Sequence, residues 1–297
     1  MKFLLIAMLA HMLGDFVFQT NRMAAIKSCS VDAYDTYKND YKNNTIFKPC
    51  KIFYLEKIGF IFLHVAIHAG ITLLMYLFSK FILHNSFEIR IFPFLAVLSI
   101  FHFVIDFLKN PLGDVLSKIT IKSDVILFIW DQLIHASIIY GLFILFSPTK
   151  HYLNLFNLSL WQSIPTIGLE NRIYMSLILC IFNVKTVSFF IAKVLKLVKN
   201  NNNYTNNQCR EDKLFSIPRN NTSIENIGAF IGMLERILIS TFIWQGINEG
   251  VTIVIAIKAF ARFKEMDDKN FAEFYLIGSL LSLMFAITTG LLLRYLF

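Results

Sequence analysis

The apolar residues of this chain fall into long runs that are separated by polar connections. The runs cover residues 2–19, 58–83, 91–109, 124–147, 173–198, 226–245, 248–263 and 272–296. A helix needs roughly 17 to 25 mostly apolar residues to cross a bilayer. The pattern therefore predicts an all-α polytopic integral membrane protein, a bundle of about eight transmembrane helices. The count falls to seven if the short, amphipathic seventh run is a re-entrant or interfacial segment.

The composition agrees with a membrane location. Hydrophobic residues make up 56% of the 297 residues and charged residues 16%, with a mean hydropathy of +0.58. Soluble domains carry a larger charged share, roughly 25%. The four cysteines have no C-x-x-C spacing, so no disulfide framework is expected. Since the lysines and arginines lie between the apolar runs, the net charge of +8 indicates membrane orientation rather than a nucleic-acid partner.

The positive charges are concentrated in alternate connections. Residues 21–57 contain seven Lys or Arg residues, residues 109–123 contain three and residues 199–225 contain four, whereas the connections between them are poor in positive charge. Basic loops remain on the cytosolic side of a membrane. We therefore expect a multi-pass membrane protein, with the basic loops in the cytosol and both termini outside.

The connections also divide the chain into two predicted units. Residues 1–147 would form a four-helix unit with the cytosolic loop 21–57, and residues 148–297 a second helical unit with the Asn-rich loop 199–225. Segments 32–57 and 199–225 are polar and lack periodicity, which is typical of flexible loops. The first run has no cleavage pattern after its apolar core, so it is expected to be a mature helix.

Each of the first four runs carries one pair of ionisable residues spaced i, i+4. The pairs are His11 and Asp15, His64 and His68, His102 and Asp106, and Asp131 and His135. This spacing puts both members of a pair on one helix face. In the predicted topology all eight side chains lie roughly 3 to 11 residues from a cytosolic helix end, and so within one thin layer of the membrane. Ionisable groups in such surroundings are costly without a partner or a metal.

Five imidazoles and three carboxylates form a donor set that suits a borderline divalent metal. Zn, Mn and Fe accept such mixed ligands, whereas Mg and Ca prefer oxygen alone. All eight residues are therefore predicted metal ligands or a general base, with His64 in a supporting position and no single catalytic residue assigned. Because eight donors exceed the needs of one tetrahedral ion, two metals are compatible with the pattern. Gln19 and Gln132 are expected to donate hydrogen bonds to the ligands.

Further motifs extend the pattern into the second half of the chain. They comprise Gln19-Thr20 after the first pair, Gln132 within the fourth, Ile-Gly-x-Leu-Glu235-Arg236, and Lys258-Ala-x-x-Arg262-Phe263. In this order the motifs resemble the bacterial membrane family known as domain of unknown function 3307, with the two Asn-rich segments as insertions. The resemblance implies a fold, a site and a location in the bacterial plasma (inner) membrane, but no reaction. A looser likeness links the chain to bacterial inner-membrane proteins described as metal-dependent hydrolases.

Three functions fit these observations. The first is a metal-dependent hydrolase, in which a metal-activated water attacks an ester or phosphoester of a lipid or another amphiphile. The second is a transporter or channel for protons or metal ions, which inverted repeats and broken helices would favour. The third is a membrane anchor whose basic loops dock a cytosolic protein. Structural roles are expected for Glu235 and Arg236, and an interfacial position for Lys258 and Arg262.

Overall fold

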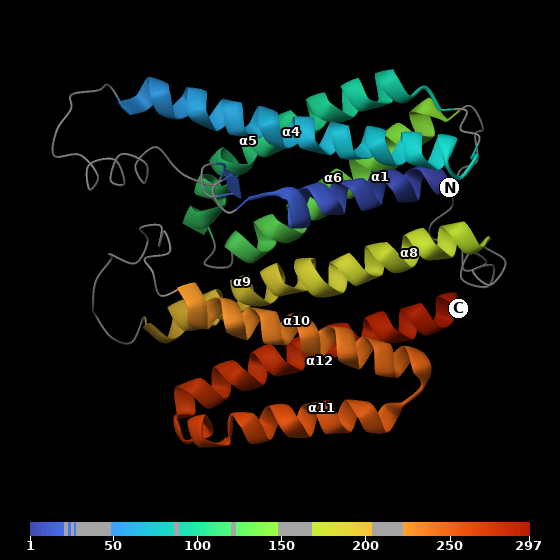
Figure 1. Cartoon of the computed structure of the whole chain (residues 1–297). Helices are drawn as coiled ribbons and strands as arrows, with labels where there is room; N and C mark the ends of the chain where they lie inside the picture. The colour runs from blue at the N-terminus through green and yellow to red at the C-terminus, as the bar shows by residue number, and fades with distance from the viewer. Residues whose placement is uncertain are drawn as a thin grey trace. The chain divides into compact units, whose positions relative to one another are not determined.

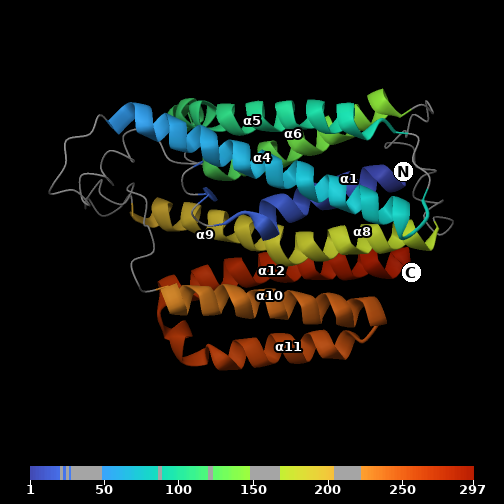
Figure 2. The same ribbon diagram turned by 45° about the horizontal axis from the view of Figure 1, so that its top comes forward.

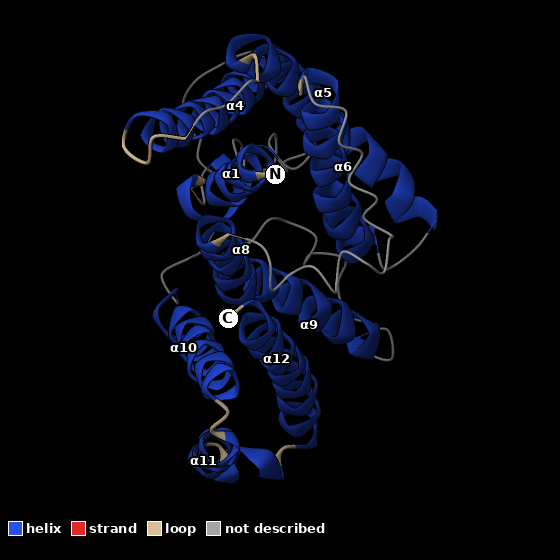
Figure 3. Ribbon diagram, turned by 90° about the vertical axis from the view of Figure 1, so that its right-hand side faces the viewer, coloured by secondary structure: helices blue, strands red, loops and turns tan. Residues whose placement is uncertain are grey.

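The computed structural model describes residues 1–20, 23–24, 27, 49–85, 89–119, 123–147, 168–203 and 222–297. Within these residues the chain forms helices joined by short turns, and it contains no strand (Figure 3). The prediction of an all-α fold is confirmed for this part of the chain. The chain divides into two compact units, one made of Met1–Tyr152 with Arg210–Phe215 and the other of Leu153–Cys209 with Ser216–Phe297.

In the described part of the first unit, four helices form a ring. Helix α1 (Lys2–Leu13) continues into a π-helical turn, η1 (Gly14–Phe18), and is followed by α4 (Pro49–Phe81), α5 (Ile91–Ile119) and α6 (Ser123–Phe146). Helix α4 contacts α1 and α5, and α6 contacts α5 and α1, an arrangement that can be followed in Figures 1 and 2. Such a bundle turns one face of each helix toward a shared interior.

The second unit begins with one long helical stretch. Helix α8 (Leu169–Ile181), the π-helical η3 (Phe182–Thr186) and α9 (Val187–Asn203) follow one another without a break. Then come α10 (Thr222–Gln245), α11 (Asn248–Ala261), the 3-10 turn η5 (Phe263–Asp267) and α12 (Lys269–Leu296). Helices α10 and α12 pack closely at Gly290, which has no side chain. A Cβ added there would lie only 2.7 Å from Ile243 Cβ. Ile239, Val251 and Ala286 form the core of this contact.

Several helix boundaries differ from the sequence prediction. Helix α4 begins at Pro49, so the last part of the predicted flexible segment 32–57 is helical, and α5 continues to Ile119 instead of ending near residue 109. Hydropathy detects only the apolar part of a helix, whereas polar residues can prolong a helix without a second nucleation cost. Helix α9 continues to Asn203 and α10 begins at Thr222, so both ends of the predicted flexible segment 199–225 are also helical. Residues 32–48 and 204–221 lie outside the described residues.

Within the part of the chain that the structure describes, five helical stretches are long and apolar enough to cross a membrane. They are Leu55–Phe81, Ile91–Lys109, Asp124–Phe146, Leu169–Val198 and Phe271–Leu296. Only 17–28% of the residues in their most apolar windows are buried inside the protein, and outward-facing side chains such as Phe62 and Leu145 are 67% and 72% exposed. An apolar surface of this extent suits contact with lipid. The described helices thus fit a multi-pass membrane protein, while seven or eight crossings are not confirmed.

Candidate metal centre

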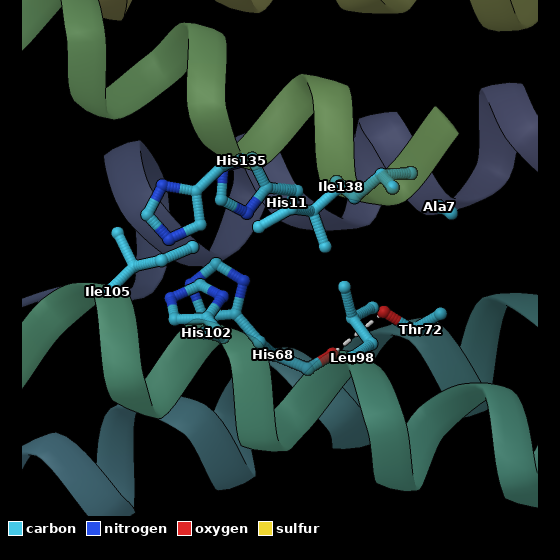
Figure 4. A pocket seen from close by; sticks show the side chains of 10 residues that line it. Ala7, His11, His68, Thr72, Leu98, His102, Ile105, His135 and Ile138 are labelled. Atoms are coloured by element: carbon cyan, nitrogen blue, oxygen red, sulfur yellow. Dashed lines mark hydrogen bonds between the residues drawn. The ribbon is translucent and has the colours of Figure 1, made fainter. Parts of the chain in front are cut away.

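All four predicted pairs converge in the interior of the first unit. Their imidazole rings form a continuous group, with centroids 4.4 Å apart for His64 and His68, 4.2 Å for His68 and His102, and 4.5 Å for His102 and His135. The ring of His11 lies 4.9 Å from that of His135 and 5.1 Å from that of His68. Figure 4 shows four of these imidazoles turned toward one another from their separate helices. The structure therefore brings the predicted residues into one cluster.

The π-helical turn η1 positions the carboxylate of Asp15. Gly14 opens this turn, and a Cβ at Gly14 would lie 2.3–2.6 Å from atoms of the His68 imidazole. The absence of a side chain at Gly14 thus lets the His68 ring approach the backbone of the first helix. Asp15 Oδ1 then lies 3.1 Å from Nε2 of both His64 and His68. Single π-helical turns of this kind are common at functional sites.

The hydrogen bond of His135 determines which of its ring nitrogens carries the hydrogen. Nδ1 lies 2.8 Å from the backbone carbonyl oxygen of Asp131. A carbonyl oxygen only accepts, so Nδ1 donates and Nε2 keeps its lone pair. His135 Nε2 is buried and has no hydrogen-bond partner among the described residues, and the same holds for Nε2 of His11 and of His102. Buried polar atoms rarely remain unpaired, and an imidazole whose other nitrogen is held by a carbonyl is oriented for metal ligation.

The eight donors form three overlapping groups that could each hold a metal ion. Within each group, one ligand atom from every residue lies within 4.8 Å of the others, and the groups are His11, Asp15, His68 and His102; His64, His102 and Asp106; and Asp106, Asp131 and His135. His64, predicted to support the site from nearer the surface, is fully buried and belongs to the second group. His102 and Asp106 each link two groups, so the three groups form one connected cluster.

Two lysines that the sequence analysis missed complete the cluster. Lys27 Nζ lies 2.6 Å from Asp106 Oδ2, and Lys109 Nζ lies 2.6 Å from Asp131 Oδ2. Both lysines had been counted only as loop charges. Lys109 could have been found from its i+3 spacing to Asp106, which places the two residues on one face of α5. Lys27 has no comparable signal, because the chain reaches it through a segment without periodicity.

The amide of Gln132 links two carboxylates of the cluster. Its Nε2 donates to Asp15 Oδ2 at 3.2 Å and to Asp131 Oδ2 at 3.4 Å. Gln132 therefore has the predicted role of a hydrogen-bond donor to the acidic residues. With neutral imidazoles, three carboxylates and two ammonium groups give the cluster a formal charge of −3 + 2 = −1. A negative formal charge in an apolar interior favours a bound cation.

A small cavity lies on one side of the imidazoles. Its volume is about 10 Å³, which is roughly enough for one water molecule. Four imidazoles line it together with Ala7, Thr72, Leu98, Ile105, Ile138 and Ile139 (Figure 4). The hydroxyl of Thr72 donates to the carbonyl of His68 at 2.8 Å, within its own helix. The cavity is thus lined by imidazole rings together with mainly apolar side chains.

The second unit contains a separate buried polar group, centred on Arg236. Its guanidinium donates to the carbonyl of Asn183 at 2.7 Å, to the carbonyl of Val184 at 3.0 Å, and to the Ser188 hydroxyl. The neighbouring Glu235 pairs instead with Lys258 at 2.6 Å. The side chains of Glu235 and Arg236 therefore have different partners, and Arg236 holds α10 against the η3 turn.

Comparison with known proteins bears on the first unit. Residues 44–163 match the family model described as Protein of unknown function (DUF3307). This range contains six of the eight cluster residues, from His64 to His135. No curated protein and no solved structure matches the chain at a significant level. The resemblance carried by the motifs is thus confirmed over residues 44–163, where the chain matches the DUF3307 family.

Proposed function

We propose that this protein binds divalent metal in its four-helix unit and uses a metal-activated water to hydrolyse an ester or phosphoester of a membrane amphiphile. The observation that carries the proposal is the set of buried Nε2 atoms of His11, His102 and His135, which lie beside carboxylates and have no hydrogen-bond partner in the described part of the chain. Zn, Mn or Fe would satisfy these nitrogens together with the carboxylate oxygens. The bacterial plasma membrane, with the basic loops cytosolic, is the proposed location.

The overlapping groups favour two unequal ion positions. If Nε2 of His102 ligates a metal in the first group, that group has three imidazoles and one carboxylate, a full tetrahedral set. Asp106, Asp131 and His135 then make a three-residue set. Structural zinc sites have four protein ligands, whereas catalytic sites keep one position for water or substrate. The three-residue set is therefore the proposed position of the chemistry.

Bound metal would supply a water of lowered pKa and polarise the substrate oxygen. The chain's own residues would orient that water and take its proton. His64 is suited to accept the proton, because its Nδ1 is buried without a partner while its Nε2 contacts Asp15. Gln132, which donates to Asp15 and Asp131, would keep the two carboxylates in place.

Proton or metal-ion transfer is the second candidate function, and one observation favours it. The rings of His64, His68, His102 and His135 follow one another at centroid distances of 4.2–4.5 Å. Chains of imidazoles and carboxylates also relay protons through membrane proteins. Ion flux in proteoliposomes distinguishes the two functions: a flux that His102→Ala abolishes, without hydrolysis of any ester, would favour transfer.

Metal content tests the proposal directly. Purified wild-type protein loaded with Zn, Mn or Fe should retain about one or two ions per chain after desalting, while His102→Ala and Asp131→Asn should lose about 10- to 100-fold in metal affinity. His84→Asn is the matched control, because His84 lies in a turn outside the cluster with a φ of 52° that asparagine tolerates. A folded wild-type protein that takes up none of these metals would rule out the hydrolase.

A further inference from the structure

We propose that Lys27 and Lys109 form a binding subsite for a phosphate group when a divalent ion occupies the centre. This inference rests on the proposed metal function and adds the chemical class of the ligand. In the described structure each lysine is paired with a carboxylate at 2.6 Å, Lys27 with Asp106 and Lys109 with Asp131. The same two carboxylates belong, with His135, to the three-residue metal group.

A bound metal would compete with the two lysines for the carboxylate oxygens of Asp106 and Asp131. Asp106 Oδ2 contacts Lys27 and also lies 3.6 Å from Nε2 of both His64 and His102. Asp131 directs Oδ1 toward His135 at 3.6 Å while Oδ2 holds Lys109. A metal bound by these carboxylates would therefore share them with both ammonium groups. Like charges at such short range repel strongly where water is scarce.

Metal binding would also change the formal charge of the cluster. The metal-free cluster has a formal charge of −1, from three carboxylates and two lysines. One divalent ion changes this value to −1 + 2 = +1, and two ions change it to −1 + 4 = +3. A net positive charge in an apolar interior needs an anion, just as the metal-free cluster needs a cation. Metal binding would thus convert a cation site into an anion site.

Of the two lysines, Lys109 is the more accessible from outside the protein. The side chain of Lys109 is 37% exposed, while the carboxylate it holds on Asp131 is 7% exposed. Lys109 also ends the apolar stretch Ile91–Lys109, so it lies where the helix leaves the predicted membrane interior. Lys27 is more deeply placed, at 10% exposed. A charged headgroup arriving along Lys109 would reach Lys27 and the three-residue metal group next.

A phosphate group fits this combination better than a carboxylate. Lysines bind phosphate as point charges, and a divalent ion polarises a phosphoryl oxygen for attack by water. Two ammonium groups and one metal can also contact separate oxygens of one phosphate, whereas a carboxylate offers two oxygens. The phosphate can belong to a lipid headgroup or to a soluble phosphate ester.

Calorimetric binding to the full-length, metal-loaded protein in neutral lipid nanodiscs tests the subsite. The probes are glycerol 3-phosphate and short-chain phosphatidic acid. Lys27→Gln and Lys109→Gln should each weaken binding about 10- to 100-fold, the value of a charged hydrogen bond, without lowering metal content. Lys80→Gln, an exposed lysine of α4 outside the cluster, should bind as the wild type does. Tighter binding of the phosphatidic acid would identify a lipid headgroup, and equal binding a soluble ester.

A second measurement needs no variant. Glycerol 3-phosphate should raise the Tm of the metal-loaded wild type and leave the metal-free protein unchanged, because its lysines are then neutralised by Asp106 and Asp131. The subsite is overturned, with the metal centre intact, if the loaded protein binds neither probe or if the glutamine variants bind like the wild type. A wild type that takes up no metal would instead overturn the proposed function itself, and the subsite with it.

Discussion

The imidazoles of the cluster differ in which ring nitrogen carries the hydrogen. The groups that each ring contacts determine its tautomer. An ionised carboxylate only accepts, so the Nε2 atoms of His64 and His68 that face Asp15 Oδ1 at 3.1 Å are donors. His135 donates through Nδ1 to a backbone carbonyl. Three imidazoles are thus fixed in two tautomers by their partners. The lone pairs that remain are the ones available to a metal.

Gly14 offers a test at this scale. Gly14→Ala would place a Cβ 2.3–2.6 Å from the His68 ring, so that ring must move away from Asp15. We expect a loss of roughly 1–3 kcal/mol in stability, typical of overpacking, and about tenfold weaker metal binding, measured by thermal unfolding and metal titration. Gly70→Ala on α4 is the control, since a Cβ there meets nothing within 4 Å. Equal metal affinity in the two variants would contradict the role assigned to Gly14.

At the scale of the element, the two π-helical turns play related parts. The turn η1 ends the first helix, whereas η3 lies between α8 and α9, and each contributes to a buried polar group: η1 carries Asp15 in the first unit, and η3 carries Asn183 in the second. The carbonyls of Asn183 and Val184 accept hydrogen bonds from Arg236. A side chain that inserts into a helical hydrogen-bond ladder is a recognised cause of such irregularity.

Replacement of Arg236 by lysine tests the role of its guanidinium. Arg236→Lys keeps the charge but loses the planar fork that reaches two carbonyls at once, so we expect the second unit to lose roughly 1–3 kcal/mol, the cost of an unpaired buried polar group. Arg262→Lys is the matched control, because its pair with Glu265 is exposed and such pairs contribute little. Thermal unfolding of both variants is the measurement. Equal stabilities would show that the buried fork contributes nothing.

At the scale of the whole molecule, the proposed metal residues belong to one unit and Arg236 to the other. The two units therefore have separate sources of polar stabilisation. In the proposed function a bound cation balances the carboxylates of the first unit, while the second satisfies its buried arginine with carbonyl and hydroxyl oxygens. Ligands should consequently change the stability of the first unit more than that of the second.

Tryptophan fluorescence can measure this difference. The chain contains three tryptophans, Trp130, Trp161 and Trp244, of which Trp130 lies in α6 and Trp244 in α10. In a variant that keeps Trp130 alone, metal at 100 times its Kd should stabilise by about 2.7 kcal/mol, a rise in Tm of roughly 5–10 °C. A chelator should reverse this rise in Tm. In a variant that keeps Trp244 alone, the rise should be smaller. An unchanged unfolding temperature in the first variant would contradict metal binding by the four-helix unit.

The family resemblance and the membrane character needed no coordinates, because length and hydropathy report directly on the bilayer. The boundary at Pro49 did need them. Polar residues prolong that helix, and no change in hydropathy marks where a polar helix begins. The π-helical turns were also beyond prediction, since an extra residue in a helical turn alters the ladder without altering the apolar pattern.

The i, i+4 spacing of His11 with Asp15 and of Asp131 with His135 was sufficient to predict a shared polar site, because helical periodicity is a local property that the sequence determines by itself. Tertiary structure alone decided that α6 closes the ring against α1, that Lys27 pairs with Asp106, and that Arg236 turns to Asn183 instead of Glu235. These contacts join residues far apart in the chain. Local preference does not encode such contacts, which depend on how helices pack and on which buried charges must be satisfied.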